Sequence, residues 1–225
     1  MFPISDSERT NKFPYINISI IALNIYVFYK ELTAPNMDAF ISNFALIPSS
    51  VNFSHISSFI PFITSMFLHG GFIHIISNMW FLWIFGDSVE ANLGKIKFII
   101  LFLLTGIAGN VGQFLINPAS SIPILGASGA VSGVIGAYFV LYPKAKIKTL
   151  LFLFFFFTIA EVPALIYIFY WFVLQLFSGV VSLPSTFQTG GIAFWAHIMG
   201  FTAGILFTRR FKKIETPYIE GELVE

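Results

Sequence analysis

The chain of 225 residues contains no cysteine and few charged residues. The absence of cysteine excludes disulfide bonds, thiolate nucleophiles and cysteine-ligated metal sites. Asp, Glu, Lys and Arg together make up 10% of the sequence, whereas a soluble domain carries roughly 25%. The net charge of +1 leaves no broad basic surface, which argues against a nucleic-acid-binding protein.

Apolar residues are abundant: hydrophobic residues form 56% of the chain, 29 residues are Phe, and the mean hydropathy is +0.83. A helix that crosses a membrane needs about 20 mostly apolar residues. The sequence has six candidate spans, at Ile16–Tyr29, Phe72–Ser88, Phe98–Leu115, Ser128–Tyr142, Leu150–Phe177 and Gly191–Thr208. We therefore expect an all-α, polytopic membrane protein, a single domain over residues 1–225 folded as a bundle of six transmembrane helices.

The segment between the first two spans, Glu31–Gly71, is too polar and too often broken by Ser and Pro to cross the membrane. We expect its stretch Phe53–Phe67 to lie partly in the membrane interface. Eleven of the twelve basic residues fall on one side of the predicted membrane, and only Lys30 falls on the other. Basic loops stay in the cytoplasm, so both termini, with short tails at about 1–13 and 209–225, are expected to be cytoplasmic. We expect a multi-pass protein of a prokaryotic plasma membrane.

Polar side chains occur near the outer ends of the second, fourth and sixth spans, where burial in lipid is costly and usually serves a function. His74 and Asn78 lie four residues apart, on one face of the second span. Ser128 opens the fourth span, and His197 lies about two turns into the sixth. These positions predict that the four side chains lie at similar depth in the outer half of the membrane.

The four residues are the groups that serine-based peptide hydrolysis requires. A serine attacks a peptide carbonyl when a base takes its proton, and histidine is the usual base. The resulting oxyanion needs hydrogen-bond donors, which Asn78, His74 and the free backbone N–H groups of a helix's first turn can supply. No Asp or Glu lies near His197 in its span. The residues therefore indicate a dyad of Ser128 and His197.

The fourth span is short, since Ser128–Tyr142 gives about 22 Å of helix against a hydrocarbon layer of roughly 30 Å. Pro143 and the lysines that follow hold its inner end near the cytoplasmic surface. Its outer end is therefore expected below the outer surface, in a polar cavity that water can enter.

Small residues one turn apart occur in both helices of the expected dyad: Gly129 and Gly133, and Gly200 and Gly204. Such pairs let two helix backbones approach closely. We expect the fourth and sixth spans to be in contact, as a hydrogen bond between Ser128 and His197 requires.

Four motifs make the chain resemble the rhomboid family of intramembrane serine proteases. They occur in family order across about residues 66–205: HGG-x2-H-x3-N (His69, Gly70, Gly71, His74, Asn78), E-x3-G-x3-F (Glu90, Gly94, Phe98), G-x-S-G (Gly126, Ser128, Gly129) and A-H-x2-G-x3-G (Ala196, His197, Gly200, Gly204). The sequence departs from the family pattern at Ser132, where members often carry an aromatic residue that supports the histidine ring. It also lacks the Trp-Arg pair common in the first outer loop.

The resemblance implies Ser128 as the nucleophile, His197 as the base, and His74 with Asn78 at the oxyanion. Gly126, in the G-x-S-G motif, is implied to be a structural glycine. The resemblance further implies that the protein uses no metal or cofactor. Its partners are then the lipid bilayer and single-span membrane proteins, cleaved near small residues in a loosened helix.

Other readings stay open from the sequence. A family relative without activity, acting as a binding or quality-control protein, would be expected to lack Ser128 or His197, and both are present. A small transporter would place ionisable residues along one path at the midplane, whereas the third and fifth spans contain only Glu161 as a charge. Ser132 is a second candidate nucleophile, but its own N–H is expected to bond within the helix.

The sequence contains two further histidines, and it offers candidates for the part that moves to admit substrate. His69 and His55 are expected to be structural. A metal site made by these two with His74 is not expected, because no HExxH motif and no nearby carboxylate are present. Trp171 and the outer loop Ser178–Gly190 are the candidates for the part that moves to admit substrate.

Overall fold

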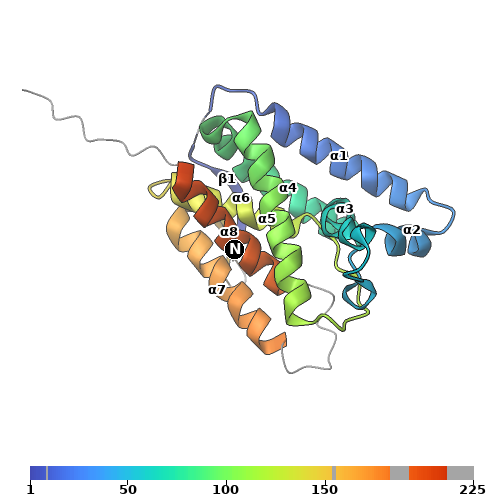
Figure 1. Cartoon of the computed structure of the whole chain (residues 1–225). Helices are drawn as coiled ribbons and strands as arrows, with labels where there is room; N and C mark the ends of the chain where they lie inside the picture. Colours follow the sequence, from blue (N-terminus) through green and yellow to red (C-terminus); the bar gives the residue numbers. More distant parts are fainter. Residues whose placement is uncertain (9, 154–155, 183–192, 212–225) are drawn as a thin grey trace, which may run out of the picture.

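A computed structural model describes residues 1–8, 10–153, 156–182 and 193–211 (Figure 1). The elements are β1 (Phe2–Asp6), α1 (Tyr15–Leu32), α2 (Met37–Phe44), η1 (Pro48–Ser50), η2 (Ile56–Phe59), α3 (Pro61–Thr64), η3 (Ser65–Phe67), α4 (Phe72–Leu93), α5 (Lys95–Ile116), α6 (Ser128–Leu141), β2 (Lys146–Leu153), β3 (Phe156–Pro163), α7 (Ala164–Ser182) and α8 (Phe194–Phe211). The short η elements are 3-10 helices.

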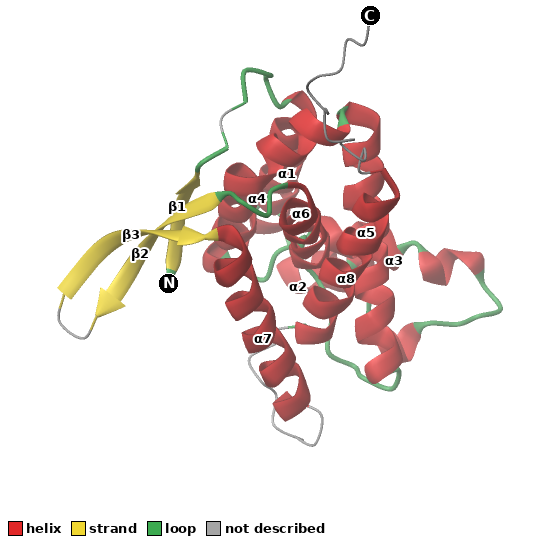
Figure 2. Cartoon of the chain, turned by 90° about the vertical axis from the view of Figure 1, so that its left-hand side faces the viewer, coloured by secondary structure: helices red, strands yellow, loops and turns green. Residues whose placement is uncertain are grey.

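The helices form a bundle in which α6 lies at the centre, with α4, α5 and α8 packed around it (Figures 1 and 2). Among the described residues, α4, α5 and α7 are each long and apolar enough to cross a membrane. The apolar helix α6 is shorter, with 14 residues. The structure therefore confirms a mainly helical membrane protein with a short central helix.

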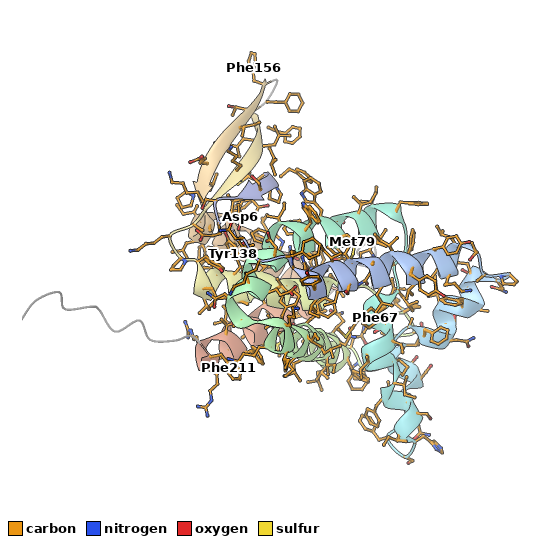
Figure 3. The ribbon with its side chains drawn as sticks, turned by 90° about the horizontal axis from the view of Figure 1, so that it is seen from above. Asp6, Phe67, Met79, Tyr138, Phe156 and Phe211 are labelled. Atoms are coloured by element: carbon orange, nitrogen blue, oxygen red, sulfur yellow. The ribbon has the colours of Figure 1, made fainter. Side chains whose placement is uncertain are left out.

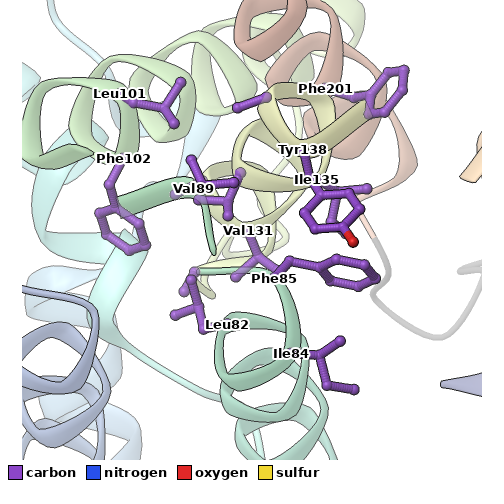
Figure 4. Close-up of a cluster of buried hydrophobic side chains, with 14 of the residues drawn as sticks. Leu82, Ile84, Phe85, Val89, Leu101, Phe102, Val131, Ile135, Tyr138 and Phe201 are labelled. Atoms are coloured by element: carbon purple, nitrogen blue, oxygen red, sulfur yellow. The ribbon is translucent and has the colours of Figure 1, made fainter. Parts of the chain in front are cut away.

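The core of the bundle is formed by large side chains from α4, α5, α6 and α8 (Figure 4). Phe85 of α4 and Tyr138 of α6 are completely buried, with ring centroids 4.9 Å apart in an edge-to-face arrangement. Phe102 of α5 and Phe201 of α8 complete this cluster. Dispersion contacts between such closely packed rings help to hold the helices together.

Helices α6 and α8 pack at backbone contact, as the glycine pairs predict. A Cβ atom added at Gly200 would overlap the carbonyl oxygen of Gly129, and one added at Gly204 would overlap that of Gly133. Only glycine allows this approach, because any side chain would separate the two backbones. The expected contact between the helices of Ser128 and His197 is confirmed.

The predicted fifth span, Leu150–Phe177, is wrong over its first half, and the all-α fold class holds only in part, because a three-stranded sheet accompanies the helices. Strands β2 and β3 form an antiparallel hairpin, with Lys146 opposite Pro163, and helix α7 begins only at Ala164. The total hydropathy of this apolar run suits a helix, and only the start of β2, before Leu150, shows the alternation of buried and exposed residues that is typical of a strand. Ile147 and Thr149 are buried, whereas the lysines beside them are exposed.

The N-terminal segment, predicted to belong to a cytoplasmic tail, instead contains strand β1, which pairs antiparallel with β2. Figures 2 and 3 show the resulting sheet projecting from one side of the helices, with Phe156 near its tip. Asp6 at the end of β1 accepts hydrogen bonds from Tyr138 Oη at 2.9 Å and Ser88 Oγ at 3.1 Å. Burial raises the pKa of Asp6 to about 6. These contacts attach the sheet to α4 and α6.

The segment between α1 and α4 contains only short helices, in agreement with the expectation that it holds no span. Asn110 of α5 attaches it to the bundle by donating from Nδ2 to the carbonyl of Phe62 at 2.8 Å and to Ser65 Oγ at 2.9 Å. The buried carboxylate of Glu31 accepts the backbone N–H of His69 at 3.0 Å. These bonds fix the chain just before α4 begins.

Candidate active site

The N-terminal ends of α4, α6 and α8 surround a cavity of about 910 Å³. Four side chains singled out from the sequence line it: His74 and Asn78 from α4, Ser128 from α6 and His197 from α8. The cavity lining contains no Asp, Glu, Lys or Arg among the described residues. The structure thus brings the expected serine, base and side-chain donors to one uncharged cavity.

Ser128 is the first residue of α6, and no side chain caps this helix start. The backbone N–H of Val131 donates to the carbonyl of Ala127 at 2.9 Å, so the N–H groups of the preceding turn have no carbonyl one turn earlier in the helix. Ser132 also lines the cavity, but its hydroxyl donates to the carbonyl of Ser128 at 2.7 Å. Free backbone donors therefore accompany Ser128, whereas Ser132 is bonded to its own helix.

Gly126 brings the loop before Ser128 against the donors of α4. Its φ of 118° is a conformation that residues with a side chain rarely adopt. A Cβ atom added there would lie 2.5 Å from His74 Nε2 and 3.8 Å from Asn78 Nδ2. The N–H of Gly126 donates to the carbonyl of Ser65 at 2.9 Å, which holds the loop in place. Gly126 is required both for its backbone angle and for the space beside the His74 ring.

Asn78 presents a buried donor to the cavity. The residue is 6% exposed, and its Nδ2 has no hydrogen-bond partner within the described part of the chain. A buried donor left unpaired costs about 1–3 kcal/mol. The amide is therefore suited to bind an oxygen of a molecule that enters the cavity.

His197 is held by two side chains of α7. Its Nδ1 lies 2.8 Å from Gln175 Oε1, and its ring stacks on Trp171, with centroids 6.3 Å apart and planes inclined by 27°. Trp171 lines the cavity as well. Sequence reasoning missed Gln175, although it is a polar residue in an otherwise apolar span, the same signal that identified Asn78.

His69 is completely buried, and neither ring nitrogen has a hydrogen-bond partner among the residues described. Its ring packs edge-to-face against His74 at 5.1 Å and against Phe28 at 6.4 Å. Burial lowers the pKa of His69 to about 3, so the ring is neutral at physiological pH and packs as an apolar group behind the cavity. Of the candidate gate loop, residues 183–190 lie outside the described residues.

The family model of the Rhomboid domain matches residues 57–213, which is more than half of the chain. The chain belongs to the rhomboid family. The match includes α4, α6, α7 and α8, the helices that supply the serine, both histidines and their neighbours in this rhomboid protein.

Relatives of this rhomboid protein occur in bacteria and in mitochondria. It is 37% identical to the putative rhomboid protease YdcA of Bacillus subtilis over 76 residues, 34% of this chain and 38% of that protein. It is 35% identical to Rhomboid protein 1, mitochondrial, of Saccharomyces cerevisiae over 140 residues, 60% of this chain and 38% of that protein. It is 28% identical to the presenilin-associated rhomboid-like protein, mitochondrial, of Bos taurus over 157 residues, 69% of this chain and 39% of that protein. The chain thus spans less than half the length of each of these relatives.

Proposed function

We propose that this rhomboid protein is an intramembrane serine endopeptidase that cleaves the transmembrane helices of single-span proteins. The observation that carries the proposal is the single cavity that gathers Ser128, His197 and the unpartnered amide of Asn78. An uncapped helix start at Ser128 adds backbone donors to the same place. A packing role alone explains neither the buried donor nor its position beside a serine and a histidine.

In the proposed reaction, Ser128 Oγ attacks the carbonyl carbon of the scissile peptide bond while His197 Nε2 takes its proton. The tetrahedral intermediate collapses as the C–N bond breaks, and His197 returns the proton to the leaving amine. Water then attacks the acyl-enzyme, with His197 again acting as the base, and releases the carboxyl product together with free Ser128. No cofactor takes part in either step.

Donors that face the developing oxyanion supply the main stabilisation in such a reaction. Asn78 Nδ2, the His74 ring and the backbone N–H groups at the start of α6 are proposed for this role. Their positions are fixed before substrate arrives, since Gly126 is bonded to Ser65 and Asn78 lies on a buried helix face. Little reorganisation is then needed in the transition state.

We propose six membrane spans, formed by α1, α4, α5, α6, α7 and α8, with both termini in the cytoplasm. Basic residues support this orientation because they gather at the end of the bundle opposite the cavity. Lys12 Nζ donates to the carbonyl of Ala91 at 3.0 Å, Lys95 lies 4.3 Å above the ring of Tyr15, and Lys97 lies 4.8 Å above that of Phe211. The cavity then opens in the outer half of the membrane. A prokaryotic plasma membrane is the compartment proposed.

The proposal is tested by incubating the purified protein, in detergent, with a generic single-span membrane protein. The wild type is expected to cut the substrate, and Ser128→Ala and His197→Ala to leave it intact. Ser132→Ala, the matched control one turn away, is expected to keep substantial activity. Cleavage by Ser128→Ala at the wild-type rate would refute the assignment of the nucleophile. Binding without cleavage by folded wild-type protein would favour an inactive binding protein instead.

A further inference from the structure

The ring of His197 has a hydrogen-bonding partner on a different helix from any residue of the proposed dyad. Gln175 lies on α7, and its Oε1 is 2.8 Å from His197 Nδ1. A carbonyl oxygen can only accept a hydrogen bond, so Nδ1 must carry the proton in this arrangement. A neutral imidazole has one ring proton, and its Nε2 is then unprotonated.

This tautomer is the one that a base beside Ser128 needs, because the lone pair of Nε2 must be free to take the serine proton. In the other tautomer Nε2 carries the proton and cannot act as the base. The stacking of Trp171 on the same ring fixes the plane of the imidazole. The hydrogen bond from Nδ1–H to Gln175 Oε1 fixes the rotation of the ring within that plane. Helix α7 therefore determines both the orientation and the tautomer of the ring.

Within the described part of the chain, the ring of His197 has no hydrogen-bond partner other than Gln175. The cavity lining includes one further titratable group, His74 from α4, and the residues that α6 and α7 add to it carry no ionisable side chain. Helix α5 adds no residue to the lining. Ser132 bonds to the carbonyl of Ser128, so its hydroxyl is already engaged. An uncharged amide is thus the partner of His197 where a carboxylate would complete a charged triad.

We propose that Gln175 is a positioning residue for the base: its Oε1 accepts a hydrogen bond from the Nδ1–H of His197 and so keeps Nε2 free to activate Ser128. The inference rests on the proposed protease function. An amide in this role selects the tautomer without adding negative charge, which leaves the imidazole easier to deprotonate than a carboxylate partner would.

The test compares Gln175→Met, which removes the acceptor at similar volume, with Gln175→Glu, which keeps it and adds a charge. Two rates are measured: labelling of Ser128 by a small fluorophosphonate, and cleavage of a single-span substrate. Gln175→Met is expected to lower both the labelling rate and kcat by about 10- to 100-fold, with KM little changed. Gln175→Glu is expected to restore both at high pH. The acid limb of the pH–rate profile of Gln175→Glu should lie about one pH unit above that of the wild type, because a carboxylate favours the charged imidazole.

Gln113→Met is the matched control, since Gln113 lies on α5 outside the cavity lining, and its rates should stay at the wild-type level. A loss of cleavage with unchanged labelling would show that Gln175 acts on substrate entry, and would overturn the proposal. Equal damage from Glu and Met would overturn it as well, because it would mean that the amide donates to Nδ1. Wild-type protein that neither cleaves nor labels, with Ser128→Ala as its reference, would instead refute the protease function itself.

Discussion

Two buried asparagines of this protein differ in what their amides bind. Asn110 donates both hydrogen bonds of its Nδ2 to the segment before α4, and it therefore holds structure together. Asn78 is almost equally buried, yet its Nδ2 has no partner among the described residues. Selection for stability alone would remove such a donor, because it weakens the fold. The contrast, together with the place of Asn78 in the cavity lining, supports the proposed role of its amide as an oxyanion donor.

Asn78→Ala is expected to lower kcat by roughly 10²–10³-fold, as loss of one oxyanion donor does. The thermal midpoint of unfolding should fall only modestly, since no hydrogen bond of Nδ2 is lost. Asn110→Ala provides the comparison: its midpoint should fall clearly, while kcat per folded molecule stays near the wild-type value. Steady-state kinetics and thermal unfolding in detergent measure both. The reverse pattern would make Asn78 the packing residue.

At the scale of elements, the contact of α6 with α8 is made by backbone atoms. It places the serine helix and the histidine helix at backbone contact, so the separation of Ser128 and His197 depends on residues that have no side chain. A methyl group at Gly204 cannot be accommodated without moving a backbone, because it would overlap a carbonyl oxygen of α6 and not a flexible side chain. Close packing of α6 on α8 is therefore also a condition for the proposed reaction of Ser128 with His197.

Gly204→Ala is expected to destabilise the protein by about 1–3 kcal/mol, the usual range for overpacking, and to lower fluorophosphonate labelling of Ser128. Gly179→Ala is the control, since a Cβ atom there meets the end of the Ile198 side chain at 3.2 Å, which can shift. Denaturation in mixed micelles and the labelling rate give the two readouts. If both variants behave like the wild type, the glycine contact does not set the site geometry.

Asp6, at the end of strand β1, is expected to make the stability of the fold depend on pH. Its folded pKa of about 6 lies above the ordinary 3.8, so the folded state binds this proton more tightly than the unfolded state. The stabilising contribution is therefore complete below about pH 4 and is lost as pH rises through about 6. The thermal midpoint of the wild type should fall between about pH 5 and about pH 7 relative to that of Asp6→Asn, which cannot ionise. Asp38→Asn, an exposed carboxylate on α2, should leave the slope unchanged.

The helices and the site residues followed from the sequence because each rests on a local signal. Long apolar runs predicted the long helices, and polar residues at matching depth indicated Ser128 and its neighbours. The hairpin after α6 did not follow, since hydropathy alone treats a buried helix and an apolar hairpin alike. Gln175 did not follow either. Its role depends on which face of α7 meets α8, and that is a property of the packed bundle.

At the scale of the whole molecule, the natural absence of cysteine makes the orientation directly measurable. Ser54→Cys and Glu161→Cys each create a single exposed thiol, the first before α3 and the second on β3. In right-side-out vesicles, a membrane-impermeant maleimide is expected to label Ser54→Cys, and to label Glu161→Cys only after permeabilisation. Loss of the Lys146–Glu161 ion pair should matter little, because both side chains are more than half exposed. Labelling with the opposite pattern would invert the proposed topology and put the cavity in the inner half of the membrane.

Helix α7 is exposed along much of its length and yet supports the base of the proposed dyad. Only 22% of its apolar stretch is buried inside the bundle, against 50% for α4 and 44% for α5. It nevertheless carries both side chains that hold the His197 ring. Any displacement of α7 that parts it from α8 must therefore break the bond from Gln175 and remove the stacking of Trp171 in the same movement. In the proposed protease, separation of α7 from α8 would therefore leave His197 without either support, and the base would regain them only when the two helices met again.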